Sequence, residues 1–218
     1  KPSQDEAIIF LPGVALDAHS KSVINSTKDL VNASKLTSYS ISTRLENPEI
    51  ENSQSFQAEA IQKFISEKGL KEITLVGNSQ GANKAIFVNH ELKHNSPDVK
   101  IRGLILTSPA GLYNQESPEL TKNFFKDSII NTPPTVIKDS KVGSMNKIKN
   151  TLGRMGRSLR IGTDVSIGIG KEIISSPTQF SKRATRESTE AATRNPYTSE
   201  VECPIVIILG ENDTAFKI

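Results

Sequence analysis

Short apolar runs separated by helix-like segments constrain the fold of this chain more than any other feature. The clearest runs cover residues 7–11, 73–76, 101–107 and 204–209, with a weaker one at 38–43. The first is continuously apolar and ends in Pro-Gly, which is typical of a strand buried on both faces. Helix-like segments cover residues 17–33, 53–68 and 79–94. This alternation predicts an α/β fold, with a mostly parallel sheet and helices on both faces.

One predicted helix, over residues 53–68, has an apolar stripe at helical spacing. The stripe contains Phe56, Ala60, Ile61, Phe64 and Ile65. Such a stripe is expected to face the core, and the glycine at position 69 is a typical helix stop.

The segment 77–81, Gly-Asn-Ser-Gln-Gly, joins one apolar run to a helix-like stretch. A serine at the tip of such a strand–turn–helix is held out from the sheet, where it can attack a carbonyl carbon. Glycines on both sides allow the tight turn without Cβ clashes. The motif therefore makes Ser79 the candidate nucleophile.

The rest of the chain offers several partners for this serine. A serine hydroxyl needs a base, usually a histidine oriented by a carboxylate, and N–H donors for the developing oxyanion. The backbone N–H groups of Gln80, at the helix start, and of Val14, after the first strand, are the candidate donors. Asp213 follows the last apolar run and is the candidate carboxylate. All these positions lie at carboxyl ends of strands, where open parallel sheets bind their ligands.

Residues 112–197 interrupt the alternation and are rich in Ser, Thr, Lys and Arg. They hold 14 Lys and Arg against 8 Asp and Glu, whereas the whole chain has a net charge of +3. We predict a mainly helical cap here, inserted into a core formed by residues 1–111 and 198–218. Residues 147–160 place apolar side chains at helical spacing with basic ones on the other faces. This favours a cap helix packed on the core, and contact of its basic face with an anionic membrane is the alternative.

The chain resembles the α/β-hydrolase family through four segments that occur in the family's order. They are Phe-Leu-Pro-Gly at 10–13, Gly-Asn-Ser-Gln-Gly at 77–81, Ser-Pro-Ala-Gly-Leu at 108–112, and residues 203–216. The resemblance implies a serine hydrolase that cleaves an ester or related acyl bond of a small molecule through an acyl-enzyme on Ser79, without a cofactor. A carbon–carbon bond hydrolase, an acyltransferase and a non-catalytic binding protein of the same fold are the alternatives.

Two features depart from the family pattern. Pro-Gly at 12–13 stands where the family often has His-Gly, which keeps the backbone donor but removes a side chain. The family histidine is expected roughly two to four dozen residues after Asp213, and only five residues follow Asp213 here. His19 comes too early in the chain, and His90 and His94 lie on the helix behind Ser79. The sequence therefore predicts that the catalytic histidine is absent from this chain and that both ends belong to a longer sequence.

A second motif points to different chemistry. The segment 90–94, His-Glu-Leu-Lys-His, matches the H-E-x-x-H pattern of zinc peptidases. Its two histidines share a helix face and could bind Zn²⁺, with Glu91 as the base. A third ligand would be Glu116 or Glu119. Because the motif ends directly before a predicted helix stop at Pro97, a solvated helix end is favoured and no metal is expected.

The remaining composition excludes several classes of protein. A single cysteine, Cys203, excludes an internal disulfide and a multi-cysteine metal cluster. It is predicted to be a packed thiol and fits a reducing compartment such as the cytoplasm. No run approaches the about 20 apolar residues of a membrane span. No basic motif interleaved with aromatic residues points to nucleic acid, and the oligomeric state stays open.

Overall fold

The computed structural model describes residues 5–13, 16, 18–41, 53–112, 186, 189–190 and 192–209. The predicted elements within these ranges are all present, with ends that shift by a few residues. The strands are β1 (Glu6–Leu11), β2 (Thr37–Ser40), β3 (Glu72–Asn78), β4 (Lys100–Thr107) and β5 (Ile205–Ile208); the helices are α1 (Lys21–Ser34), α2 (Ser53–Glu67), α3 (Gln80–Asn95) and the short 3-10 helix η2 (Pro196–Glu200). None of the described helices has the length and apolar character needed to cross a membrane.

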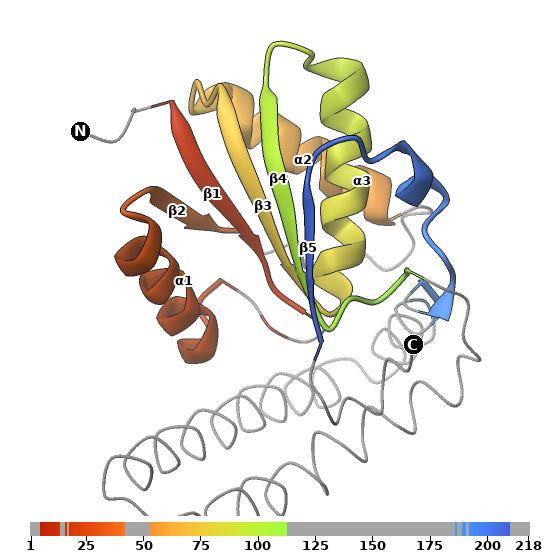
Figure 1. Cartoon of the computed structure of the whole chain (residues 1–218), viewed down its shortest axis with the longest axis horizontal. Coiled ribbons are helices and arrows are strands. Elements are labelled where there is room, and N and C mark those ends of the chain that lie inside the picture. The colour runs from red at the N-terminus through yellow and green to blue at the C-terminus, as the bar shows by residue number, and fades with distance from the viewer. Residues whose placement is uncertain are drawn as a thin grey trace, which may run out of the picture.

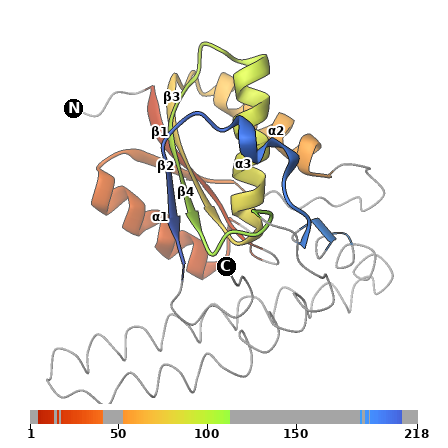
Figure 2. The same cartoon turned by 45° about the vertical axis from the view of Figure 1, so that its right-hand side comes forward.

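The five described strands form one parallel sheet in the order β2-β1-β3-β4-β5. Helices α2 and α3 cover one face of this sheet, and α1 covers the other (Figure 1 and Figure 2). The predicted α/β architecture is therefore confirmed. Because the described strands all point the same way, the carboxyl ends of β1, β3, β4 and β5 lie at one edge, which is where such sheets bind ligands.

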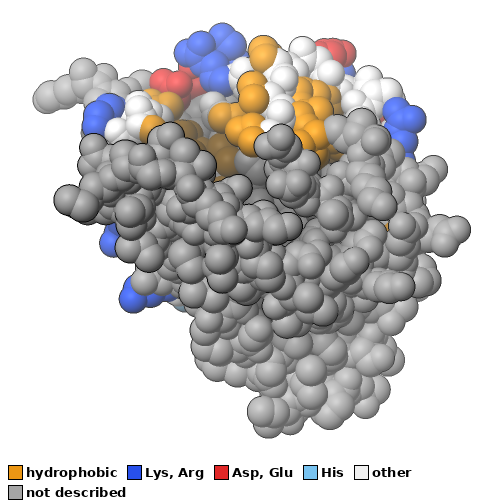
Figure 3. Space-filling view, turned by 60° about the horizontal axis from the view of Figure 1, so that its bottom comes forward, with side chains coloured by type: hydrophobic (Ala, Val, Ile, Leu, Met, Phe, Trp, Pro, Cys, Tyr) orange, Lys and Arg blue, Asp and Glu red, His pale blue; other side chains and the backbone are white. Residues whose placement is uncertain are grey.

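Strand β5, at the edge of the described sheet, is exposed although its sequence is apolar. It pairs with β4 from Leu104 to Thr107, yet its four apolar side chains are 41 to 53% exposed. Figure 3 shows hydrophobic side chains gathered on the described surface, beside the residues drawn in grey. Among the described residues, the two buried clusters include side chains of β1, β3 and β4 but none of β5. Within the part of the chain that the structure describes, β5 is therefore the strand with the most exposed apolar side chains.

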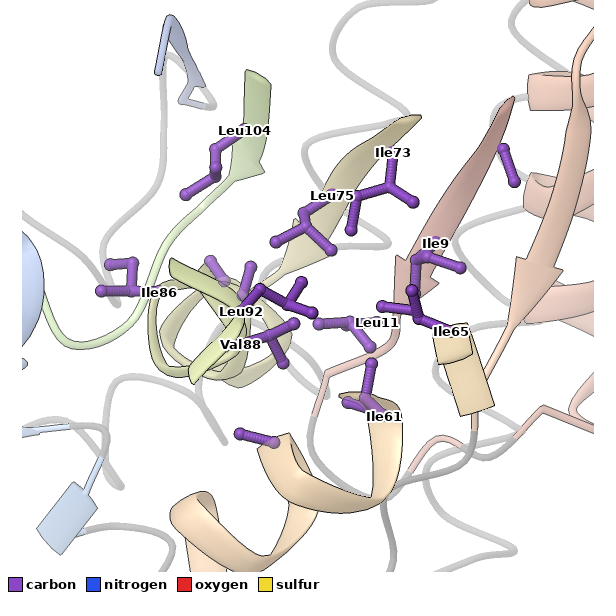
Figure 4. Close-up of a cluster of buried hydrophobic side chains, with 14 of the residues drawn as sticks. Ile9, Leu11, Ile61, Ile65, Ile73, Leu75, Ile86, Val88, Leu92 and Leu104 are labelled. Atoms are coloured by element: carbon purple, nitrogen blue, oxygen red, sulfur yellow. The ribbon is translucent and has the colours of Figure 1, made fainter. Parts of the chain in front are cut away.

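Successive side chains of β1 supply two separate cores. On one face, Ile9 and Leu11 join the large cluster that also includes residues of β3, β4, α2 and α3 (Figure 4). On the other face, Ile8 and Phe10 pack with Val23 of α1. Burial of each such side chain is worth about 1.5–3 kcal/mol. The larger cluster holds α3 against the sheet and so fixes the position of the residue that precedes this helix, Ser79.

The buried face of α2 differs from the predicted apolar stripe in its first turns. Phe56 is 47% exposed and Ala60 is also exposed, whereas Gln54 and Gln57 are buried. Gln54 has a polar partner in this position, because its Nε2 donates a hydrogen bond of 2.8 Å to the carboxylate of Glu190. The later turns bury the two predicted isoleucines.

Candidate active site

Ser79 is the single residue between β3 and α3. Its backbone lies at φ 54° and ψ −121°, a conformation that costs a non-glycine residue on the order of 1–3 kcal/mol. Three backbone hydrogen bonds hold it there: its N–H donates to Thr107 O at 2.9 Å, and its carbonyl accepts from Ala82 N–H at 3.0 Å and Ala110 N–H at 3.1 Å. The surrounding strands and helix therefore maintain the strained turn.

The glycines on either side of the turn are required by the space around them. A Cβ atom on Gly81 would lie 2.0 Å from Leu11 O, and one on Gly77 would lie 2.5 Å from Ala82 Cα. Side-chain atoms do not approach backbone so closely, since both distances are far inside van der Waals contact. The prediction that these glycines avoid Cβ clashes is confirmed, and they let the start of α3 lie directly against the end of β1.

The hydroxyl of Ser79 is not used to cap the helix. A serine at the N-cap usually accepts a hydrogen bond on its side-chain oxygen from an N–H of the first turn. Ser79 is the N-cap residue of α3 but makes no side-chain capping bond. Ser79 is half-buried and lies at the carboxyl edge of the sheet.

Two of the predicted partners can be located relative to this hydroxyl. Gln80 is the first residue of α3, so its backbone N–H is one of those without a partner inside the helix. The loop after β1 also lies beside the turn, since a Cβ on Gly13 would be 3.1 Å from Ser79 Cβ. Val14 follows directly in the chain but, like Asp213, lies outside the described residues. The roles of both residues stay predictions.

Two of the three histidines of the chain lie far from Ser79. His90 and His94 lie near the far end of α3, and the helical rise places His90 about 16 Å from Ser79 along the axis. This separation excludes both as the base for Ser79. His19 lies in the turn that precedes α1.

A buried polar network beneath the Ser79 turn has no counterpart in the sequence prediction. Gln80 is 1% exposed, and its Nε2 lies 3.4 Å from the same Glu190 oxygen that accepts from Gln54 at 2.8 Å. Asn83 Nδ2 donates to Glu190 O at 3.2 Å, and Asn195 Nδ2 donates to Asn83 O at 3.1 Å. The sequence signal for this network is a pair of amide residues, Gln80 and Asn83, at the start of α3.

This network also joins the two sides of the inserted region. Asn195 N–H donates to Gly111 O at 2.7 Å. Gly111 has φ 78°, and a Cβ there would lie 2.6 Å from Asn83 Cγ. The chain therefore leaves β4 and returns toward β5 at one place, beside α3. Most of the predicted cap, residues 112–197, lies outside the described residues, so the cap stays a prediction.

Cys203 is packed, as predicted. It lies against the larger core cluster, and its Sγ is 3.7 Å from Asn89 Oδ1. Burial raises the pKa of this thiol above its ordinary value. Because the thiolate is the reactive form of cysteine, a raised pKa is the opposite of what a nucleophilic cysteine requires.

Several solved structures are similar to this chain over nearly its whole length. An α/β-hydrolase enzyme from a deep-sea metagenome library of the Medee basin is 16% identical and covers 97% of this chain and 74% of its own, with a TM-score of 0.54. A thermophilic esterase from Thermogutta terrifontis is 14% identical and covers 99% of this chain and 75% of its own, with a TM-score of 0.57. An N-formylmaleamic acid deformylase from Pseudomonas putida is 11% identical and covers 97% of this chain and 76% of its own, with a TM-score of 0.55. No protein-family model and no curated protein matches the sequence.

The parallel strand order, the helices on both faces and these likenesses define one architecture. The chain has the α/β-hydrolase fold, as its resemblance to that family predicted. At identities of 11 to 16%, these likenesses show the fold alone.

Proposed function

We propose that the protein is a serine hydrolase that cleaves an ester or related acyl bond of a small molecule, with Ser79 as the nucleophile. The observation that carries the proposal is the strained backbone of Ser79 at the start of α3, with a hydroxyl that makes no capping bond. Backbone strain of this kind persists mainly at functional sites, where the fold over-determines the geometry. An esterase and a deformylase among the structural neighbours support the same class of reaction.

The proposed reaction follows from the position of Ser79. Its Oγ attacks the substrate carbonyl carbon and loses its proton to a base, which returns the proton to the leaving group as the acyl-enzyme forms. Water then attacks the acyl-enzyme and releases the acid. The N–H groups of Gln80 and Val14 stabilise the oxyanion, for which each donor is worth roughly 3–4 kcal/mol. Asp213, in the chain after β5, is the proposed carboxylate that orients the base.

A fluorophosphonate probe tests this role of Ser79 directly. The probe phosphonylates a serine hydroxyl that a base activates, so we expect the full-length protein to be labelled and Ser79→Ala in the full-length protein to lose labelling. Ser108→Ala is the matched control, because Ser108 directly follows the neighbouring strand β4 and its backbone N–H, which the substitution keeps, donates to Ile208 O at 2.8 Å. This variant is expected to keep the label. Labelling is measured by gel fluorescence and mapped by peptide mass spectrometry.

Two outcomes would contradict the proposal. Label that persists in Ser79→Ala would assign the reaction to another residue. A full-length protein that is folded by circular dichroism but takes up no probe would favour the alternative of a binding protein with this fold.

A further inference from the structure

Two histidines and a glutamate meet at the C-terminal end of α3, far from Ser79. His90 and His94 are one helical turn apart, with ring centroids 4.3 Å from each other. Glu200, in η2, places its Oε2 2.7 Å from His90 Nδ1. One ligand atom from each of the three residues lies within 4.8 Å of the other two. We propose that His90, His94 and Glu200 bind a divalent transition-metal ion, with Zn²⁺ as the metal that fits best.

The hydrogen bonds of His94 leave the correct nitrogen available. Its Nδ1 lies 2.8 Å from His90 O. A carbonyl oxygen only accepts, so Nδ1 carries the hydrogen and donates it. The Nε2 atom of neutral His94 then holds the free electron pair that a metal needs. This is the usual arrangement of metal-binding histidines, in which a bond from one ring nitrogen fixes the tautomer and orients the other.

The ring of His90 is held by the same segment that supplies Glu200. It stacks on Tyr197 of η2, with ring centroids 3.6 Å apart and an interplanar angle of 10°. The distance of 2.7 Å between His90 Nδ1 and Glu200 Oε2 is that of a direct hydrogen bond. With zinc–ligand bonds of about 2.0–2.1 Å, a tetrahedral ion would hold these two atoms about 3.3 Å apart. The Glu200 side chain is 37% exposed, so we expect a small side-chain movement to open this distance.

The donor set selects the class of metal. Two imidazoles and one carboxylate suit zinc and its neighbours in the transition series, whereas Ca²⁺ and Mg²⁺ prefer oxygen donors alone. His94 is exposed, so a water molecule can complete the coordination. The third ligand differs from the sequence prediction, which named Glu116 or Glu119. Both of those residues lie outside the described ranges.

The location of the cluster indicates a structural role. α3 and η2 lie side by side in both views (Figure 1 and Figure 2), and η2 belongs to the segment that returns to β5. A metal here would tie that segment to the end of α3. Glu91, the base in a peptidase, instead accepts a hydrogen bond of 2.7 Å from Asn95 Nδ2 and is not one of the three converging ligands.

Zinc titration of the chelator-treated protein tests the site, with competition against a chromophoric chelator as the readout. We expect one Zn²⁺ per chain and a higher melting temperature when Zn²⁺ is bound. His94→Ala and Glu200→Gln are each expected to weaken binding by at least about tenfold and to remove the rise in melting temperature. His19→Ala is the matched control, because the chain has only three histidines and His19 lies outside the cluster. Glu91→Gln is likewise expected to keep full zinc affinity.

A second measurement separates a built site from loose surface binding. In the protein loaded with Co²⁺ in place of Zn²⁺, we expect the intense visible absorption of tetrahedral coordination, and its loss in His94→Ala. Because both His94 and Glu200 are partly or fully exposed, the metal-free variants are expected to melt as the metal-free wild type does. Absence of zinc binding, or binding that is equally tight in His94→Ala and Glu200→Gln, would overturn the proposal. Loss of affinity in Glu91→Gln would also overturn it, since Glu91 would then be a ligand.

Discussion

Single residues around the Ser79 turn are constrained for different physical reasons. Ser79 adopts a backbone conformation that serine disfavours, which the fold holds in place through hydrogen bonds. Gly81 is constrained by volume, because a Cβ there would lie 2.0 Å from Leu11 O. Gly69, after α2, is constrained only by its φ of 65° and has open space around it. These two glycines separate the cost of steric overlap from the cost of backbone conformation.

Substitution of each glycine by alanine is expected to destabilise the protein to a different degree. Gly69→Ala should lower the free energy of unfolding by about 1 kcal/mol, the cost of a left-handed backbone in a residue with a Cβ. Gly81→Ala should lower it by about 3 kcal/mol or more, because the end of β1 or the start of α3 has to move. Urea denaturation followed by circular dichroism measures both values. Equal losses would show that β1 and α3 do not approach as closely as described.

At the scale of elements, β4 and β5 have similar apolar sequences but different surroundings. Leu106 of β4 is fully buried between the neighbouring strands and α3, whereas Val206 and Ile208 of β5 are 53% and 51% exposed. Apolar burial is what a strand contributes to stability. Strand β5 is therefore held mainly by its backbone pairing with β4.

Substitutions in the two strands are expected to have opposite consequences. Leu106→Ala should cost about 2–5 kcal/mol of unfolding free energy, as is usual for a fully buried leucine. The double variant Val206→Thr/Ile208→Thr should lower the free energy of unfolding by less than about 1 kcal/mol. It should also reduce the binding of a hydrophobic fluorescent dye to the native protein. A large loss of stability in the threonine variant would mean that β5 is covered in solution.

The elements themselves could be predicted from the sequence because their signals are local. The apolar run of β3 and the glycines around Ser79 are both visible within a few residues. The buried position of Gln54 could not be predicted, because its partner Glu190 lies more than a hundred positions away in the sequence. Glu200 was missed as a partner of His90 for the same reason. Its place beside α3 results from the path of the chain after the insertion.

At the scale of the whole molecule, two cores share the same strands. Ile9 belongs to the core on the α2 and α3 side, and its neighbour Phe10 belongs to the core on the α1 side. Because β1 contributes side chains to both cores, displacement of this strand disrupts the packing of both. The described sheet is therefore expected to unfold as one cooperative unit.

Truncations on either face test this cooperativity. Ile9→Ala and Phe10→Ala should each lower the midpoint of a single urea transition, by about 2–5 kcal/mol in unfolding free energy. Circular dichroism and tyrosine fluorescence should give coincident curves for both variants. Separate transitions in the Phe10→Ala protein would show that α1 and its core unfold independently of the rest.

The hydrogen bond between Asn195 and Gly111 has a consequence for how a protein of this kind can diversify. The segment between these residues departs and rejoins at one point, so its length is decoupled from the geometry of the strands. Doubling the length of such a loop costs only about 0.6 kcal/mol of closure entropy. Selection can therefore extend, shorten or exchange this segment while Ser79 keeps its position. The hydrogen-bonded pair of Gly111 and Asn195 is therefore a fixed attachment point for inserted segments of different length and sequence. It is also the place where a designed insertion could be grafted.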